Sequence, residues 1–175
     1  MGLEEELGEL EKGEIGLLLV EAGDYVDTNM EALRYLTEDR DSLGVYVTIN
    51  KPYSTIKNFL EEHDVDTGKL FFVDAVSKEV GEETVDDDQV LFMDSPENLT
   101  GLSIVVSKAV DSMPDRDKFV FLDSLTTLEV YNEMDTVSRF AHFLTGKMRK
   151  WDASGVIISL EQETDEELVN RISQF

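Results

Sequence analysis

The chain has 175 residues, of which 41% are hydrophobic, and this is enough to bury the core of a single domain. Its 39 acidic and 15 basic residues give a formal net charge of −24, so its surface repels the phosphate backbone of nucleic acids and direct nucleic-acid binding is disfavoured. Cysteine is absent, which excludes disulfide bonds, thiolate zinc sites and cysteine nucleophiles.

The N-terminal segment and the hydropathy pattern bear on the cellular compartment. No apolar run approaches the roughly 18–20 residues that cross a bilayer. The first residues, MGLEEELGELEKGE, lack the basic region and apolar core of a secretory signal. We therefore expect a cytoplasmic protein with no membrane span, in which residues 1–12 form an acidic helix or extension and residues 13–175 form the domain.

Short apolar runs recur along the chain and predict β-strands. Most of them are apolar throughout, as expected for parallel strands that are buried on both faces. In chain order they are Ile15–Val20, Val45–Ile49, Leu70–Val73, a shorter peripheral run at Val90–Met93, Phe119–Leu122 and Val156–Leu160.

Helical patterns separate these runs, and most begin at a recognisable start signal. The signals are Asp27 as a cap, Pro52 in a first turn, Ser95–Pro96 as a cap and first-turn proline, Asn132 near the start of the longest helix, and Thr164–Glu167 as a capping box. Strands that alternate with crossover helices predict an α/β fold, a three-layer α/β/α domain around a mostly parallel sheet.

Ligands of such sheets bind outside the carboxyl ends of the strands, so the segment after the first strand is a candidate phosphate-binding loop. Such a loop needs glycines, a lysine and a hydroxyl that holds magnesium. Residues Glu21–Asn29 contain one glycine, Gly23, no lysine, and three carboxylates. Two like charges 4 Å apart repel by about 1 kcal/mol in water and about 4 kcal/mol at a dielectric constant near 20. We therefore expect a turn capped by Asp27 instead of a phosphate loop.

Two further strand ends carry polar residues. Asn50 follows the second strand, where ATP-hydrolysing domains often place a catalytic carboxylate, and an amide cannot act as a base. Asp123 and Ser124 follow Phe119–Leu122, and an aspartate after four apolar residues is typical of a Walker B strand, whose carboxylate holds magnesium through water. A helix cap at Asp123 or Ser124 explains the same pattern almost as well.

These segments together resemble the RecA superfamily, and within it the KaiC/Rad55-like P-loop ATPases. The resemblance is carried by LGVYVTINKPYSTIKNFLEEHDVDTGKLFFVDAVS, FVFLDSLTTLEVY and VSRFAHFLTGKMRKWDASGVIISLEQE, in that order, and it spans about Gly13 to Phe175. It implies a RecA-like fold with a site for ATP and magnesium. Because family members continue into further strands, it also implies a small core or a truncated chain.

The sequence departs from this family at the positions that hold and hydrolyse ATP. The lysine and flanking glycines are missing from Ala22–Asn29, Asn50 stands where the catalytic glutamate belongs, and only Asp123 and Ser124 match the magnesium-binding motif. We therefore expect a pseudo-ATPase with a degenerate Walker A motif, no catalytic residues and no bound cofactor. Gly23, Asp123 and Ser124 would be a vestigial nucleotide site. The implied function is a regulatory or protein–protein interaction module that meets a partner, or a second copy, through a RecA-like surface.

One alternative is an ATP-binding protein or weak Mg-dependent ATPase with an unconventional phosphate loop. Asp123 would then hold the metal, and a neighbouring subunit would supply the missing positive charge. The candidates for that charge are Arg116, Arg149 and Lys150.

A second alternative is a receiver-like phosphoacceptor with Asp74, at the end of the third strand, as the phosphorylated residue. Glu21 and Asp24 would imitate the acidic pair of a receiver. The lysine that receivers need after the last strand is missing from Leu160–Gln162.

Overall fold

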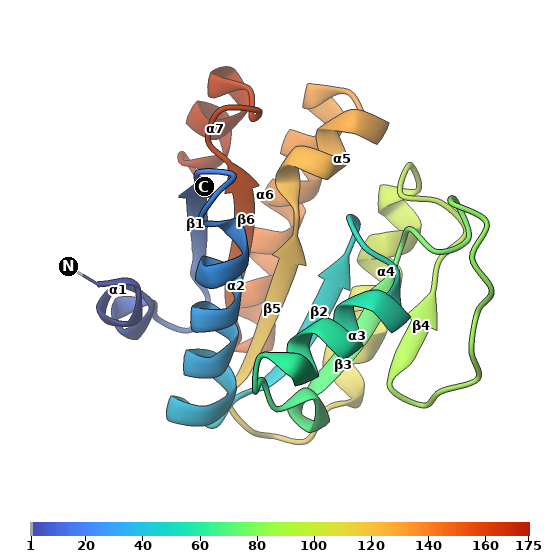
Figure 1. The fold of residues 1–175 in the computed structure, drawn as a ribbon. Helices are drawn as coiled ribbons and strands as arrows, with labels where there is room; N and C mark the ends of the chain where they lie inside the picture. The colour runs from blue at the N-terminus through green and yellow to red at the C-terminus, as the bar shows by residue number, and fades with distance from the viewer. Residues whose placement is uncertain (1) are drawn as a thin grey trace.

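A computed structural model describes residues 2–175 (Figure 1). Within them, six strands form one sheet in which every neighbouring pair is parallel, in the order β1-β6-β5-β2-β3-β4. The strands are β1 (Ile15–Val20), β2 (Leu43–Thr48), β3 (Leu70–Asp74), β4 (Val90–Phe92), β5 (Lys118–Asp123) and β6 (Ser154–Leu160). All six predicted strands are therefore confirmed, with ends shifted by at most two residues.

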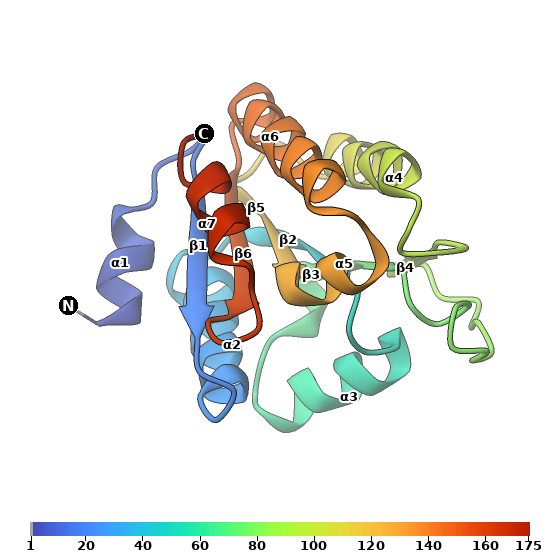
Figure 2. The ribbon, with the colours of Figure 1, turned by 90° about the horizontal axis from the view of Figure 1, so that it is seen from above.

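Helices cover both faces of the sheet, which confirms the three-layer α/β/α arrangement (Figure 2). One face carries α2 and α3, the other carries α4 and α6, and α1 lies beyond the β1 edge beside α2. The helical segments are α1 (Leu3–Glu9), α2 (Tyr25–Arg34), the π-helical η1 (Tyr35–Asp39), α3 (Tyr53–Glu62), the 3-10 turn η2 (Thr67–Lys69), α4 (Leu99–Ser112), α5 (Leu125–Tyr131), α6 (Met134–Trp151) and α7 (Glu166–Ile172). Within residues 2–175, none of them combines the length and the apolar character that crossing a membrane requires.

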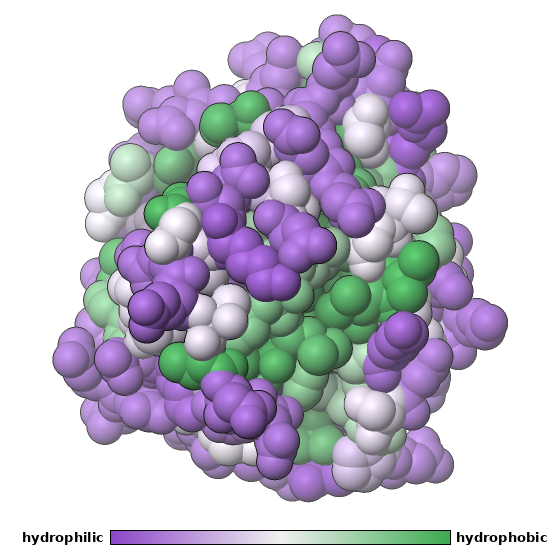
Figure 3. All heavy atoms as spheres, turned by 90° about the vertical axis from the view of Figure 1, so that its right-hand side faces the viewer, coloured by the Kyte–Doolittle hydropathy of each residue, from purple (hydrophilic) through white to green (hydrophobic). Residues whose placement is uncertain are grey.

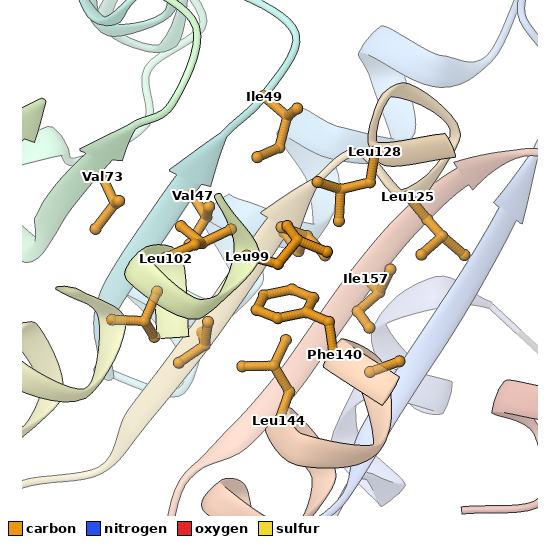
Figure 4. Close-up of a cluster of buried hydrophobic side chains, with 14 of the residues drawn as sticks. Val47, Ile49, Val73, Leu99, Leu102, Leu125, Leu128, Phe140, Leu144 and Ile157 are labelled. Atoms are coloured by element: carbon orange, nitrogen blue, oxygen red, sulfur yellow. The ribbon is translucent and has the colours of Figure 1, made fainter. Parts of the chain in front are cut away.

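Alternate residues of each strand point to opposite faces and build two separate cores. Val47 of β2 and Ile157 of β6 pack with Phe140 and Leu144 on the α4–α6 side (Figure 4). Tyr46 of β2 and Phe121 of β5 stack on the α2–α3 side, with ring centroids 5.4 Å apart. Burial on both faces is why the inner strands β2, β3, β5 and β6 are apolar at nearly every position.

The free edge of the sheet at β4 exposes apolar side chains. Figure 3 views the molecule from this edge and shows apolar residues across the middle of the face, with hydrophilic residues around them. Leu91 of β4 and Ile104 of α4 are exposed, as are Val80 and Val85 in the β3–β4 loop. The three residues of β4 make it a short edge strand, which limits pairing with other chains.

Several predicted helix starts are wrong, because tertiary contacts take over from capping. α2 begins at Tyr25 after Asp24, so Asp27 lies in the first turn and is not the cap. The cap of α4 is Asn98, whose Oδ1 accepts from the backbone N–H of Gly101 at 2.8 Å, and Ser95–Pro96 lies outside the helix. The cap of α7 is Asp165, because the Thr164 hydroxyl donates to the carbonyl of Leu160 at 2.7 Å.

The region after β5 contains a helix that the sequence analysis did not separate from its surroundings. Ser124 is the cap of this helix, α5, and its Oγ accepts from the backbone N–H of Thr127 at 3.3 Å. The capping role that the sequence left open at this position is thus confirmed for Ser124. The long helix predicted near Asn132 is confirmed as α6, which begins at Met134 and ends at Trp151.

Two glycines should respond oppositely to the same substitution. A Cβ at Gly44 in β2 would lie 2.2 Å from Cζ of the buried Phe119, whereas a Cβ at Gly146 on α6 would meet no atom within 4 Å. We expect Gly44→Ala to lower the free energy of unfolding by about 1–3 kcal/mol through overpacking. Gly146→Ala should raise it by up to about 1 kcal/mol through helix propensity. Urea unfolding of both variants measures this, and equal effects would contradict the packing at Gly44.

Candidate functional site

The carboxyl ends of the parallel strands meet at one edge of the sheet, the upper edge in Figure 1, which Figure 2 views from above. A cavity of about 230 Å³ opens there between the ends of β1, β2, β5 and β6. Its lining residues are Ala22, Tyr25, Asn50, Ser124, Thr126, Thr127, Val130, Leu160 and Glu163. The fold thus gathers at one site the strand ends that the sequence analysis singled out.

Asp123 lies beneath this cavity and is 1% exposed. One of its carboxylate oxygens accepts a hydrogen bond from the hydroxyl of Tyr25, and the other accepts one from the hydroxyl of Tyr46. Burial raises the pKa of the Asp123 carboxyl to about 7, and burial also raises the pKa of Tyr46, so its phenol stays protonated and donates. Both oxygens that would face a magnesium-bound water are therefore occupied by protein hydroxyls.

The segment after β1 forms a turn and the first turn of α2. Tyr25, the first residue of α2, brings its hydroxyl to Asp123, and no side chain caps this helix. Ala22 and Tyr25 line the cavity, whereas Gly23 does not. Gly23 therefore lies in the turn before α2, outside the cavity lining.

Asn50 extends the hydrogen-bond chain toward solvent. Its Nδ2 donates to the hydroxyl of Tyr25 at 3.5 Å, and that hydroxyl donates in turn to Asp123. The position expected for a catalytic glutamate thus holds the amide of Asn50, which contacts Tyr25, the tyrosine that donates to Asp123. Asn50 and Asp123 could be identified from the sequence, whereas Tyr25 and Tyr46 could not, because neither the polar turn around Tyr25 nor the apolar strand around Tyr46 shows which carboxyl their hydroxyls contact.

Three hydroxyl side chains form a buried cluster beside the cavity, which sequence analysis also missed. The Thr126 Oγ1 lies 3.0 Å from the Ser159 Oγ and 3.2 Å from the Thr164 Oγ1, and it accepts from the backbone N–H of Leu160 at 2.8 Å. The cluster joins α5 to the end of β6. The one available signal was Ser159, a polar residue within the otherwise apolar run Val156–Leu160.

Asp74 does not form a receiver-like site. It is fully buried and accepts from the backbone N–H groups of Tyr53 at 2.7 Å and of Val76 and Ser77 at 2.8 Å each. Strands β6, β5 and β2 separate β1 from β3, so Glu21 and Asp24 do not lie beside it. Asp74 therefore anchors the loop after β3, and the phosphoacceptor alternative is wrong.

The basic candidates lie at the opposite edge of the sheet. Arg116 precedes β5 and forms an ion pair with Asp41 at 2.9 Å. Arg149 and Lys150 lie in the last turn of α6, and the Arg149 guanidinium donates to the carbonyl of Phe175 at 3.1 Å. Among residues 2–175, no group of three or more carboxylate or imidazole side chains is arranged to hold a metal ion.

Comparison with known proteins places the sequence. Residues 16–175 match a family described as a family of unknown function, DUF7504. The chain belongs to this family. No curated protein matches the sequence of this DUF7504 chain.

Two solved structures from Pyrococcus horikoshii resemble the DUF7504 fold. The uncharacterised protein PH0321, crystallised in complex with an unknown peptide, superimposes with a TM-score of 0.70 at 17% identity, over 98% of this chain and 78% of its own. The KaiC-like protein PH0186 superimposes with a TM-score of 0.64 at 13% identity, over 95% of this chain and 70% of its own. At these identities the likeness shows the fold alone, which is RecA/KaiC-like as the sequence resemblance implied.

The pKa of Asp123 predicts how stability depends on pH. An aspartate titrates near 3.9 in the unfolded chain, whereas the pKa of Asp123 is about 7 in the native state. Between these pH values the native state binds more protons than the unfolded chain, so the contribution of Asp123 to the free energy of unfolding falls as pH rises. The span is about three units, or about 4 kcal/mol. We expect the stability of Asp123→Asn relative to wild type to rise by about that amount from about pH 4 to about pH 8.

Urea unfolding of both proteins across this range is the measurement, because the other groups titrate alike in the two chains and cancel in the difference. A difference that stays constant with pH would mean that the Asp123 carboxyl titrates normally.

Proposed function

We propose that this DUF7504 chain is a non-catalytic RecA/KaiC-like domain, a pseudo-ATPase that acts as a regulatory or protein–protein interaction module. The observation that carries the proposal is the contact of both Asp123 oxygens with tyrosine hydroxyls. In a working Walker B strand this carboxylate is ionised and faces magnesium through water. Here Tyr25, from the segment that would bind phosphate, takes the place of the metal's hydration shell.

Electrostatics around the cavity also disfavour ATP. A pKa of about 7 leaves Asp123 half protonated at neutral pH, and a protonated carboxyl is a poor partner for a cation. Glu21 and Asp24 bring negative charge to the segment before α2, and no lysine in residues 21–29 offsets it. The helix N-terminus contributes only about 0.3–1 kcal/mol toward binding an anion, which is less than the repulsion.

The size of the cavity points the same way. Its volume of about 230 Å³ lies below the roughly 300–1,000 Å³ typical of sites that enclose drug-sized ligands. A nucleoside triphosphate would have to displace Tyr25 or remain largely outside. The proposed degenerate Walker A segment thus lacks the contacts that would bind the phosphates of ATP, and the tyrosines reduce the space in which ATP could bind.

One of the solved structures that share this fold supports the interaction role. PH0321, which shares the fold over 78% of its own chain, was crystallised in complex with an unknown peptide, and this motivates a peptide or protein partner for the present chain. A negative, well-packed domain without a nucleotide site retains its outer helices and sheet edges as its means of acting on other molecules. A protein partner, or a second copy of the chain, is the class that these surfaces serve.

The alternative, a weak Mg-dependent ATPase, draws on the polar residues that line the cavity. Asn50, Ser124 and Thr127 lie at the edge where RecA-like domains bind nucleotide. Because Arg116, Arg149 and Lys150 lie at the opposite edge, they would have to reach a nucleotide on a neighbouring subunit. This arrangement makes the alternative depend on an assembly.

Calorimetric titration with ATP and magnesium, at low and at high salt, tests the proposal. We expect no heat of binding at millimolar nucleotide in either buffer, and the high-salt repeat screens the repulsion from a −24 chain. Saturable, magnesium-dependent binding would overturn the proposal. Asp123→Ala is the control for any ATP hydrolysis that is detected. Hydrolysis through Asp123 would disappear in this variant, whereas turnover by a contaminating enzyme would not change.

A further inference from the structure

Five of the fifteen basic residues of this acidic chain lie on α4 and α6, which are side by side on one face of the sheet (Figure 2). The two helices carry two acidic residues, Asp111 and Asp135, and have a net charge of +3 within a chain of −24. Their basic residues are Lys108, Arg139, Lys147, Arg149 and Lys150. Basic residues grouped on two adjacent helices differ from the interspersed charges of both signs that favour solubility.

None of these five cations takes part in an ion pair within residues 2–175. The pairs that occur there are formed by Lys12, Arg40, Lys57, Lys69, Lys78, Arg116 and Arg171. Carboxylates outnumber cations more than twofold, so the unpaired state of a whole helix face does not reflect a shortage of partners. Lys108, Arg139, Lys147 and Lys150 remain available to negative charge from outside the chain, whereas the Arg149 guanidinium donates to the carbonyl of Phe175.

A hollow of about 620 Å³ runs between the same two helices. Ile104 of α4 is 52% exposed there, and Phe143 of α6 is 38% exposed, beside the buried Phe140. Arg139 and Lys147 also line the hollow, and the Lys147 Nζ lies 5.3 Å from the centre of the Phe143 ring. Apolar surface thus lies directly beside unpaired positive charge.

The walls of the hollow have the length of a short helix. Its lining extends from Leu99 to Asp111 on α4 and from Thr136 to Lys147 on α6, which is about 16–18 Å at 1.5 Å per residue. Ser103 and Ser107 donate to carbonyls of their own helix, so they form a low wall and present no free donor. A groove between two helices with exposed apolar side chains is a common receptor for a third, amphipathic helix.

We propose that the groove between α4 and α6 binds an acidic amphipathic helix of a partner protein. The apolar face of that helix would cover Ile104 and Phe143, and its carboxylates would pair with Lys108, Arg139 and Lys147. The inference rests on the proposed function as an interaction module and names its partner class.

Charge and shape together select this occupant. Nucleic acid would contact the cations through its phosphates, but these contacts would not cover the apolar side chains of the groove, Ile104 and Phe143. The most acidic helix that a second copy of this chain offers within residues 2–175 is α1, but its Leu7 is 2% exposed because it packs in the core beside α2. A partner that carries its own free acidic helix meets both requirements.

The test uses a fluorescein-labelled peptide of roughly 14 residues, with leucines along one helical face and glutamates elsewhere. Two comparison peptides have the same composition in scrambled order and lysine in place of each glutamate. Fluorescence anisotropy measures binding to the wild-type chain without nucleotide, at low and high salt. We expect only the acidic amphipathic peptide to bind, and more weakly as salt screens the charges.

Variants locate the site. We expect Arg139→Glu with Lys147→Glu to weaken binding at least tenfold, and Ile104→Ser to weaken it without changing the net charge. Arg34→Glu with Lys51→Glu changes the charge equally at α2 and the start of α3, and should alter affinity by less than twofold. Circular dichroism establishes that each variant is folded.

Three results would overturn the proposal. These are equal binding of the amphipathic and scrambled acidic peptides, equal loss in the two double variants, and binding of duplex DNA or anionic phosphatidylserine vesicles through the groove without binding of the peptide. The nucleotide titration is a separate experiment, so ATP binding at Asp123 would remove the pseudo-ATPase proposal and leave the peptide result unaffected.

Discussion

The buried carboxyl of Asp123 is the constraint around which the carboxyl edge of the sheet is built. Its two oxygens join three parts of the chain: β5, which carries it, β2, which carries Tyr46, and the start of α2, which carries Tyr25. A carboxyl at this depth is costly unless both oxygens are satisfied. The two phenols satisfy them, and they also fix where α2 begins, because that helix has no side-chain cap.

The same interaction lies at the edge of the sheet where the proposed vestigial nucleotide site is located. RecA-like folds bring the end of β5 and the segment after β1 to one edge, which is where phosphate and magnesium would meet. In this chain the two segments meet through a phenol and a carboxyl. The hydroxyl of Tyr25 thus joins the start of α2 to the end of β5 at this edge.

The sheet could be predicted from the sequence because its four inner strands are buried on both faces and its two edge strands are partly buried. Each strand therefore appears as an apolar run, from Ile15–Val20 to Val156–Leu160. Helix starts were harder to predict, since Thr164 and Asp27 both have the chemistry of caps, and only their contacts show that Thr164 is engaged elsewhere and that α2 starts before Asp27. Local chemistry proposes several caps, and the tertiary structure selects among them.

The candidate site was predicted in part. Asp123, Ser124 and Asn50 were found because they follow strands in a sheet whose ends converge, but Tyr25 and Tyr46 act through contacts between residues 98 and 77 positions apart. The cations of α4 and α6 were visible as single residues. Their common face became apparent only when the two helices were seen side by side.

That common face gives the molecule an electrical polarity. A chain of net charge −24 whose helices α4 and α6 together carry +3 has an uneven charge distribution, and an approaching anion meets less repulsion at these helices than at the acidic surface. Such a field turns an incoming partner before any contact forms, so orientation is selected during diffusion as well as at the surface. Copies of the chain also repel one another, unless helices α4 and α6 of one copy meet the acidic surface of the next.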